Sequence, residues 1–440
     1  MQGLKMLSIV FAALATILSI ARAESSINSS FVYNTGRTGS LAFAVVPVQY
    51  DGSLYFHLEV PAEYSWVAIG TGDQMAGSLM WVAYRSRNGT GVTLSPRTVN
   101  GHVEPSYSSS INCHILTSNT APNGIVKANN GHDILAVNAI CHNITTSHSP
   151  TADEGEASVN LTSTTQPFIF ALGPTDRKIQ SDSKTAGIRR HVLYGQFAMD
   201  LSKTALADSN PIDEVTTQLS SVGNWQNSNA QLVGDVTRDH DWAPATHGAF
   251  MCVTFVLVFP LGVVLLRLLE RVKWHAWVQT FGVVLVVVGL GVGVYLGMQY
   301  NHSKNFNSAH QVIGIIVVVF TFVQLSIGVV HHRLYGRHGQ STALGRIHRY
   351  VGPLVLILGA VNGFLGFDFA DDGGHNVWYG VIVGVVFVAL VAALLWARRR
   401  RKVKDAVMER GDSEGEGACV HGESGRGVGR GIPLKIFGRN

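Results

Sequence analysis

Five long apolar segments in the second half of the chain are the feature that most constrains its fold. They cover residues 248–266, 276–298, 311–330, 350–369 and 377–397. Each has about 20 largely uncharged residues, the length needed to cross a hydrocarbon core about 30 Å thick. Helices buried in soluble proteins are rarely so long and so free of charge. The sequence therefore predicts a five-helix transmembrane bundle, with helices at about 246–267, 275–298, 310–331, 348–369 and 376–397.

Positive charge is concentrated in three of the segments that flank these runs. Lysines and arginines lie within 267–273, 333–349 and 398–404, whereas 299–309 and 370–376 carry little positive charge. By the positive-inside rule, the basic segments face the cytosol. We therefore expect a multi-pass membrane protein with its first half outside the cytosol and its C-terminus inside. The formal net charge of +4 then reflects topology and does not indicate nucleic-acid binding.

The N-terminus has the features of a secretory signal peptide over residues 1–23. Lys5 is followed by an apolar run from Met6 to Ile20 and by the small-residue sequence Ala21-Arg22-Ala23. The mature chain is expected to begin near Glu24 on the oxidising side of the plasma membrane or of another membrane of the secretory route. Sequons that fit an exported surface begin at Asn28, Asn88, Asn143 and Asn160.

The four cysteines are expected to have different fates because they lie in different compartments. Cys113 and Cys141 lie in the exported half, where a disulfide could join them. Cys252 lies in an apolar segment and Cys419 in a polar tail, so both are expected to stay reduced.

A histidine opens each of the first four apolar segments. These four span histidines are His247, His275, His310 and His348. On the predicted topology the first and third lie at the outer face, and the second and fourth at the cytosolic face. Two neutral imidazoles fill both axial positions of a haem iron, so such a haem transfers electrons and binds no substrate at the metal. The alternation predicts two bis-histidine haems roughly 20 to 30 Å apart, although histidines at membrane interfaces often have only a structural role.

The sequence around these histidines resembles the cytochrome b561 family. The resemblance covers about residues 242–400 and rests on the segments "HGAFM", "WHAWVQ", "AHQVIG" and "GRIHRYVGP". It implies four helices that hold two haem b groups, with His247 paired to His310 and His275 paired to His348. The chain differs from six-helix members of that family because no apolar helix precedes His247.

The exported half has a strand pattern and not a helical one. Short runs with alternating apolar positions are separated by glycine, asparagine and serine clusters. They lie at 41–48, 54–60, 66–70, 80–84, 134–140, 167–173 and 192–200. We predict an antiparallel β-sandwich over 24–203, a polar linker over 204–241, the membrane domain over 242–400 and a disordered cytosolic tail over 401–440.

Two segments of this half contain candidate iron ligands. "WVAIGTGDQMAGSLMWVAY" places Met75 in a loop between two strands, and "IRRHVLYGQFAMD" places His191 at a strand start. As a pattern alone, a gap-filling methionine and a surface histidine explain them more simply. The segments resemble the haem-binding cytochrome domain of fungal cellobiose dehydrogenases, a β-sandwich of the DOMON class. That resemblance implies that Met75 and His191 bind a third haem b, that Met80 is a core residue and that Cys113 pairs with Cys141.

Together these patterns predict electron transfer across a membrane. No strand followed by a glycine-rich dinucleotide turn is present, so the membrane haems are the candidate electron source for the exported domain. The b561 resemblance implies a cytosolic donor such as ascorbate, and ferric chelates or an extracellular redox enzyme are candidate acceptors, which would make the chain a ferric-chelate or monodehydroascorbate reductase. Candidate residues for attracting an anionic donor are Lys273, Arg346, Arg349 and His338. Their role as topology determinants explains them equally well.

Two other functions are compatible with the sequence. The sandwich could be a carbohydrate-binding or other cell-surface recognition module anchored by a haem-containing membrane domain. Metal transport by the span histidines ranks last, because the histidines lie at two levels with no polar path between them.

Overall fold

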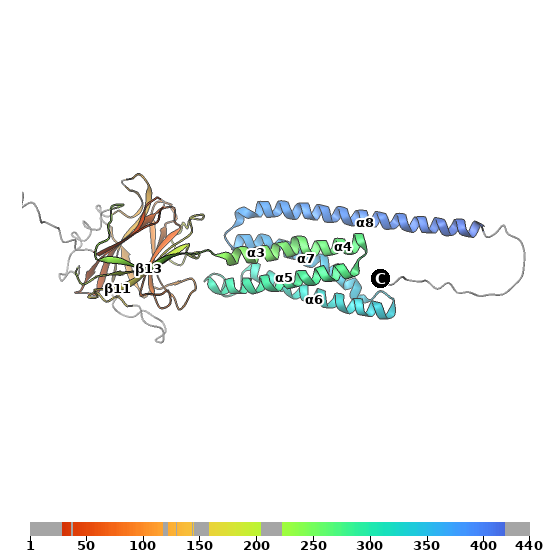
Figure 1. Cartoon of the computed structure of the whole chain (residues 1–440), viewed down its shortest axis with the longest axis horizontal. Coiled ribbons are helices and arrows are strands. Elements are labelled where there is room, and N and C mark those ends of the chain that lie inside the picture. The colour runs from red at the N-terminus through yellow and green to blue at the C-terminus, as the bar shows by residue number, and fades with distance from the viewer. Residues whose placement is uncertain are drawn as a thin grey trace, which may run out of the picture. The chain divides into compact units, whose positions relative to one another are not determined.

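The computed structural model describes residues 29–36, 38–117, 122–128, 130–142, 144, 158–203 and 222–418, with side chains to residue 408. It forms two compact units (Figure 1). The sandwich unit comprises Met1–Thr246 and Gly291–Asn307, and the helical unit comprises His247–Leu290 and Ser308–Asn440. The predicted signal peptide, two of the sequons (Asn28 and Asn143) and Cys419 lie outside the described residues.

The sandwich unit contains two antiparallel sheets, as predicted. The first has the order β1-β2-β3-β10-β8, with β9 also paired to β10. Its strands are β1 (Ser29–Asn34), β2 (Ser40–Val48), β3 (Ser53–Pro61), β8 (Asn112–Ile115), β9 (Gly124–Lys127) and β10 (Asp133–His142). The second has the order β13-β12-β11-β4-β5-β6-β7. Its strands are β4 (Trp66–Thr71), β5 (Leu79–Arg85), β6 (Val92–Thr98), β7 (Ser106–Tyr107), β11 (Gln166–Leu172), β12 (Leu193–Met199) and β13 (Ala230–Arg238).

Side-chain alternation gives the seven-stranded sheet two apolar faces. In β4, Val67 and Ile69 belong to the main core, which fills the space between the sheets with aromatic side chains such as Trp81 and Phe168. Trp66 and Ala68 point to the opposite face and belong to a second cluster. A sheet covered on only one side would expose these residues. The outer face of this sheet is therefore a second packing surface.

The predicted linker over 204–241 is wrong for residues 230–238. These form strand β13, which pairs with β12 at the edge of the seven-stranded sheet. The side chains of β13 are mostly exposed. Backbone hydrogen bonds to β12 define such an edge strand, so its sequence carries no apolar alternation to reveal it. Residues 204–221 lie outside the described part of the chain.

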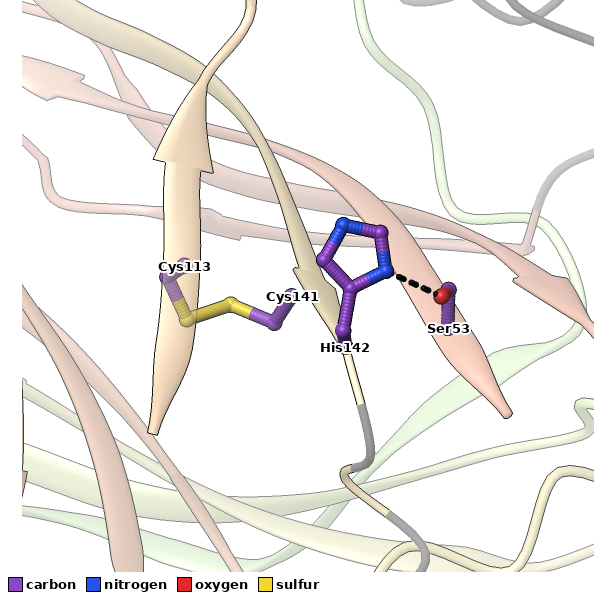
Figure 2. Close-up of a disulfide and its surroundings, with 4 residues drawn as sticks. All are labelled: Ser53, Cys113, Cys141 and His142. Atoms are coloured by element: carbon purple, nitrogen blue, oxygen red, sulfur yellow. Dashed lines mark hydrogen bonds between the residues drawn. A yellow bond between two sulfur atoms is a disulfide. The ribbon is translucent and has the colours of Figure 1, made fainter. Parts of the chain in front are cut away.

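The expected disulfide joins Cys113 of β8 to Cys141 of β10 (Figure 2). The two residues lie directly opposite each other in neighbouring strands. Next to this bond, the His142 ring Nδ1 lies 2.7 Å from the Ser53 hydroxyl of β3. The bond therefore ties the short strand β8 to a central strand of the sheet. Cys252 is free in the described part of the chain, as expected.

Replacing both Cys113 and Cys141 by serine is expected to lower the free energy of unfolding of the sandwich by about 3 kcal/mol. The bond closes a segment of 28 residues, and without it the unfolded chain gains the corresponding conformational freedom. Denaturant unfolding of the full chain followed by tryptophan fluorescence measures the change. Cys252→Ser is the matched control and should leave the midpoint unchanged. Equal midpoints for all three proteins would contradict the prediction.

Five helices in the second half are long and apolar enough to cross a membrane, as predicted. The first is made of α3 (Trp242–Val253), a π-helical turn (Thr254–Val258) and α4 (Phe259–Leu269). The others are α5 (Val272–Gln299), α6 (Ala309–His338), α7 (Ala343–Phe369) and α8 (Asn376–Ala418). Helix α8 contacts α4 and α7.

The expectation of a disordered tail from residue 401 is wrong for residues 401–418. Helix α8 continues through this segment to Ala418. Between Ala397 and Gly411 the sequence contains no glycine or proline, and seven of its thirteen residues are arginine or lysine. These residues have high helix propensity, so a helix that begins in the apolar segment can continue beyond it.

Candidate functional site

The four span histidines lie near the starts of their helices. His275 is in the first turn of α5 and His310 is the second residue of α6, while the other two are in the second turns of α3 and α7. Local sequence places these starts. Ser308 caps α6 and exchanges hydrogen bonds with Gln311 in a capping box, and Thr342 caps α7.

The structure brings the span histidines together in two pairs. The His247 and His310 ring centroids are 6.0 Å apart with the ring planes at 88°. The His275 and His348 centroids are 6.5 Å apart with the planes at 89°. We name them the 247/310 pair and the 275/348 pair. Each joins a histidine of the α3–α5 half to one of the α6–α7 half.

One ring nitrogen of every span histidine is held by a backbone carbonyl. The acceptors of the Nδ1–H groups are Gly289 for His247 (2.8 Å), Gly262 for His275 (2.8 Å), Asn362 for His310 (3.1 Å) and Gln324 for His348 (3.2 Å). A carbonyl can only accept, so Nδ1 must carry the proton. The Nε2 lone pair is then free to bind a metal, and the carbonyl sets the ring orientation.

The spacing within each pair fits one metal ion between two imidazoles. Two metal–nitrogen bonds of about 2 Å, with the ring radii added, separate the ring centroids by roughly 6 Å. No group of three or more His, Cys, Asp or Glu side chains that could hold a bare ion occurs within the described ranges. Two imidazoles alone leave most coordination positions of an iron unfilled. A macrocycle that supplies the remaining nitrogens, such as haem, fits this donor set.

Glycines give two of the rings the space they need. A Cβ added at Gly328 would lie 3.1 Å from the His348 ring, and one added at Gly366 would lie 2.9 Å from the His310 ring. Larger residues at either position would push the ring away from its pair partner. The glycines of the spans therefore include some that adjoin the histidines directly.

An apolar core lies between the two levels of histidines. His275 and Gly289 are fourteen residues apart on α5 and contact different pairs, so the levels are about 21 Å apart along the helix. Phe255 and Phe259 pack edge to face in this core, with ring centroids 5.3 Å apart. Buried valines from α5, α6 and α7 complete it: Val283, Val286, Val317, Val318 and Val355. This packing leaves little room for water between the levels.

In the sandwich unit, Met75 lies on the outer face of the seven-stranded sheet. It packs against the outer cluster that contains Trp66 and Met80. Its loop is held across the sheet, because the Gln196 side-chain amide of β12 donates to the Asp73 carbonyl at 2.6 Å. Met80 is buried in β5, in agreement with its expected place in the core.

His191 lies on the same outer face, beside β12. Its ring packs on the outward-facing Tyr194, with centroids 4.6 Å apart. Its Nδ1 is buried and lies 3.4 Å from Asp239 Oδ2 without forming a hydrogen bond. Burial lowers the pKa of His191, and the Asp239 carboxylate partly opposes this. The ring is therefore neutral at neutral pH, the form that binds iron.

Small residues occupy part of this face. Ala68 of β4 is paired with Ala171 of β11, and Gly70 is the next outward-facing residue of β4. A Cβ at Gly70 would overlap the Ser78 and Ile169 side chains. The unpartnered Nδ1 of His191 and the thioether of Met75 lie on the same face of the sheet, and an imidazole with a thioether is a known donor pair for haem iron, so the residues present here are compatible with haem.

Comparison with known proteins supports both halves of this description. Residues 24–209 match the family "Cytochrome domain of cellobiose dehydrogenase". The first half of the chain is therefore similar to a cellobiose dehydrogenase-type cytochrome domain, and curated relatives of the chain are named for cytochrome b561 and DOMON domains. Residues 230–334, which include β13 and part of the helical unit, match a family described as a domain of unknown function, DUF2427.

Curated relatives combine the same two parts in their names. Two cytochrome b561 and DOMON domain-containing proteins of Arabidopsis thaliana are 29% and 28% identical over 154 and 163 residues, which are 33% and 34% of this chain. The alignments span 37% and 39% of these relatives, less than half of their length. A solved cytochrome b domain of pyranose dehydrogenase from Coprinopsis cinerea is 19% identical with a TM-score of 0.34, covering 43% of this chain and 89% of that domain.

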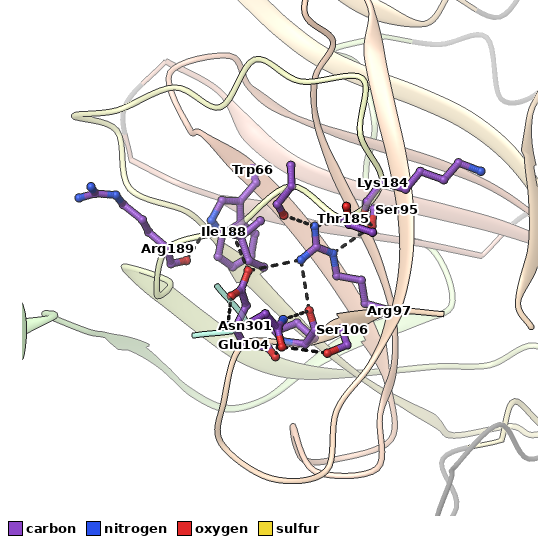
Figure 3. Close-up of polar contacts among 12 residues, drawn as sticks. Trp66, Ser95, Arg97, Glu104, Ser106, Lys184, Thr185, Ile188, Arg189 and Asn301 are labelled. Carbon is purple, nitrogen blue, oxygen red and sulfur yellow. Dashed lines mark hydrogen bonds and ion pairs between the residues drawn. The ribbon is translucent and has the colours of Figure 1, made fainter. Parts of the chain in front are cut away.

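A buried ion pair in the cytochrome domain holds the segment that leads to His191 (Figure 3). Arg97 Nη1 and Glu104 Oε1 are 3.6 Å apart, and both side chains are almost fully buried. Arg97 also donates to the Ala186 carbonyl at 2.6 Å, and Glu104 accepts the Ile188 N–H at 2.8 Å. The pair therefore fixes the backbone just before His191.

Sequence reasoning missed Arg97 and Glu104. Arg97 points to the outer face of β6, where alternation predicts a solvent-exposed side chain. It is buried because the segment 184–188, distant in sequence, covers that face. No local signal in the sequence indicates this cover.

Arg97→Met is expected to destabilise the cytochrome domain by about 3 to 5 kcal/mol, because it leaves the Glu104 carboxylate buried without its counter-ion. Chemical unfolding of the full chain measures the change. Arg87→Met is the matched control, since Arg87 pairs with Asp182 on the surface at 4.0 Å and should contribute little or nothing. Similar small effects of the two substitutions would contradict the prediction.

The four candidate donor-site residues lie at the end of the bundle that carries the 275/348 pair. Lys273 precedes His275 in α5, and Arg346 and Arg349 flank His348 in α7. His338 is the last residue of α6. All four side chains are exposed. A shallow surface hollow next to Lys273 is lined by Trp274, Trp277, Val278 and Phe281, and such aromatic side chains are typical of a membrane interface.

Proposed function

We propose that this protein transfers electrons across a membrane through haem groups, from a cytosolic reductant to an extracellular acceptor. The relatives named for cytochrome b561 and DOMON domains and the match to a cytochrome domain support haem binding and electron transfer. The observation that carries the proposal is the geometry of the two histidine pairs. Each pair has perpendicular rings about 6 Å apart, with every Nδ1 held by a carbonyl.

In this proposal, the 247/310 pair and the 275/348 pair would each hold one haem b through their two imidazoles. A bis-imidazole haem transfers single electrons and has no open position for a substrate. The carbonyls of Gly262, Gly289, Gln324 and Asn362 orient the rings and keep Nε2 unprotonated. The apolar side chains between the levels disfavour water and ions there.

Met75 and His191 are proposed to hold a third haem b in the cytochrome domain. Both residues lie on the outer face of the seven-stranded sheet. Both also fall within residues 24–209, which match the cytochrome domain of cellobiose dehydrogenase. A thioether ligand raises the reduction potential relative to a second imidazole. Electron flow from the membrane region to the exported domain would then be downhill.

The proposed donor is ascorbate or a related ene-diol, and the proposed acceptors are ferric chelates or a redox enzyme. The exposed positive charges of Lys273, Arg346 and Arg349 lie beside the 275/348 pair, and the positive-inside rule assigns this end to the cytosol. They would attract an anionic donor to the haem level from which transfer begins.

Difference spectra of the purified full-length protein test this function. Anaerobic ascorbate is expected to produce a reduced haem α-band whose amplitude is a large fraction of that obtained with dithionite. If dithionite also gives no α-band, the protein binds no haem and the proposal fails. If dithionite gives the band and ascorbate does not, the protein binds haem but the proposed class of donor is wrong.

A further inference from the structure

The carbonyls that hold the span histidines follow a regular spacing in the α6–α7 hairpin. His310 donates to Asn362, which lies fourteen residues after His348 on α7. His348 donates to Gln324, which lies fourteen residues after His310 on α6. Each helix therefore supplies one histidine and, fourteen residues later, the carbonyl that holds the histidine of the other helix.

The hairpin formed by α3, α4 and α5 has the same arrangement with one extra residue. His247 donates to Gly289, fourteen residues after His275. His275 donates to Gly262, which lies fifteen residues after His247. The π-helical turn Thr254–Val258 lies between His247 and Gly262. A π-helical turn contains one more residue than an α-helical turn, whereas α6 is α-helical throughout.

At the level of the 275/348 pair, each hairpin has one glycine that packs against one glutamine. The two residue types occupy opposite helices in the two hairpins. A Cβ at Gly262 would lie 2.4 Å from the amide nitrogen of Gln279, which is four residues after His275. A Cβ at Gly352, four residues after His348, would lie 2.9 Å from the amide nitrogen of Gln324. One hairpin thus has glycine on its first helix and glutamine on its second, and the other hairpin has the reverse.

The other level repeats this exchange. Gly289 faces Met251, four residues after His247, with a Cβ-to-Cε distance of 3.2 Å. Gly314 lies four residues after His310, and a Cβ added there would lie 3.1 Å from the amide nitrogen of Asn362. At both levels a glycine on one helix makes room for a larger side chain, a glutamine, methionine or asparagine, on the other helix.

We propose that the two hairpins are copies of one haem-holding unit, and that the π-helical turn is an inserted residue that keeps the Gly262 carbonyl on His275. An extra residue inside an α-helix rotates everything after it by about 100° and advances it by 1.5 Å. That rotation would turn the Gly262 carbonyl away from the His275 ring. The π-helical turn absorbs the residue, and the sequence after it keeps the register found in α6. The inference rests on the proposed role of the histidines as haem ligands.

Deletion of one residue tests the insertion. Leu257 and Phe320 both lie ten residues after their histidine, and both are exposed (49% and 45%). Deleting Leu257 should convert the π-helical turn to α-helix and retain both membrane haems. It is made together with Pro260→Ala, because a proline inside a regular α-helix is unfavourable, and is compared with Pro260→Ala alone. Helix α6 contains no inserted residue, so deleting Phe320 should rotate the Gln324 carbonyl away from His348 and lose the haem of the 275/348 pair.

Exchange of the glycine and glutamine tests the repeat without any deletion. Gly262→Gln alone should displace the Gln279 amide and lose the haem of the 275/348 pair. Gly262→Gln combined with Gln279→Gly reproduces the arrangement of Gln324 and Gly352 and should restore it. Haem content per purified chain and the number of steps in a redox titration are measured for every variant of the full-length protein.

The inference is overturned if deletion of Leu257 loses a haem, if deletion of Phe320 loses none, or if the double exchange is no better than Gly262→Gln. A wild-type protein without two membrane haems would instead contradict the proposed function, so the two failures are distinguishable.

Discussion

Replacing His348 by alanine is expected to remove one haem per chain and to abolish transmembrane electron transfer. The substitution leaves His275 without its partner across the 6.5 Å gap. The 247/310 pair, about 21 Å away along the helix, should keep its haem. Haem content and redox titration of the purified protein measure the first effect. Reduction of an external ferric chelate by ascorbate enclosed in proteoliposomes measures the second.

His332→Ala is the matched control for this experiment. His332 lies on the exposed surface of α6, close in sequence to the same end of the bundle, and is not part of a pair. Its replacement should leave haem content and transfer rate unchanged. If His348→Ala retains the full haem content, the proposed ligation at this level is wrong.

Replacing Met75 by alanine is expected to remove the third haem or to lower its occupancy strongly, because the thioether is the proposed second ligand to its iron. Met75→His should keep two strong ligands and bind haem with a lower midpoint potential, since the methionine ligand raises the potential. Haem content and redox titration of the full-length protein distinguish the two variants. The two membrane haems provide an internal reference in both measurements.

Met80→Leu is the control, because Met80 is a buried residue of the same outer cluster and the change conserves volume. Its spectrum should equal that of the wild type. If Met75→Ala leaves haem content and spectrum unchanged, the sandwich does not bind haem through Met75. A carbohydrate- or ligand-recognition module would then explain the sandwich better.

Much of the fold could be predicted from the sequence because its signals are local. Apolar length defines the helices, and short apolar runs between turn residues predicted seven of the described strands: β2, β3, β4, β5, β10, β11 and β12. The runs did not predict β1 or the strands from β6 to β9. The helix ends and the edge strand β13 could not be predicted as well. Apolar character stops at residue 397 while helix propensity continues, and the mostly exposed side chains of β13 leave no pattern.

For the candidate site too, some features could be predicted from the sequence and others could not. The alternation of His247, His275, His310 and His348 along the chain was sufficient to predict which two meet at each level. The acceptors of their Nδ1 protons were not predictable, since a backbone carbonyl has no sequence signature. Gln324 and Asn362 are polar residues within apolar spans, but Gly262 has no such feature.

The amino-acid sequence by itself determined that this protein has an N-terminal sandwich and five apolar helices, with histidines at alternate ends of the first four. Hydrophobicity, periodicity and spacing are properties of neighbouring residues and can be assessed without coordinates. Only the tertiary structure decided the orientation of each imidazole, the burial of Arg97 and the use of the π-helical turn to keep Gly262 opposite His275. Each of these depends on contacts between residues far apart in the chain, which form only when the helices and sheets have packed.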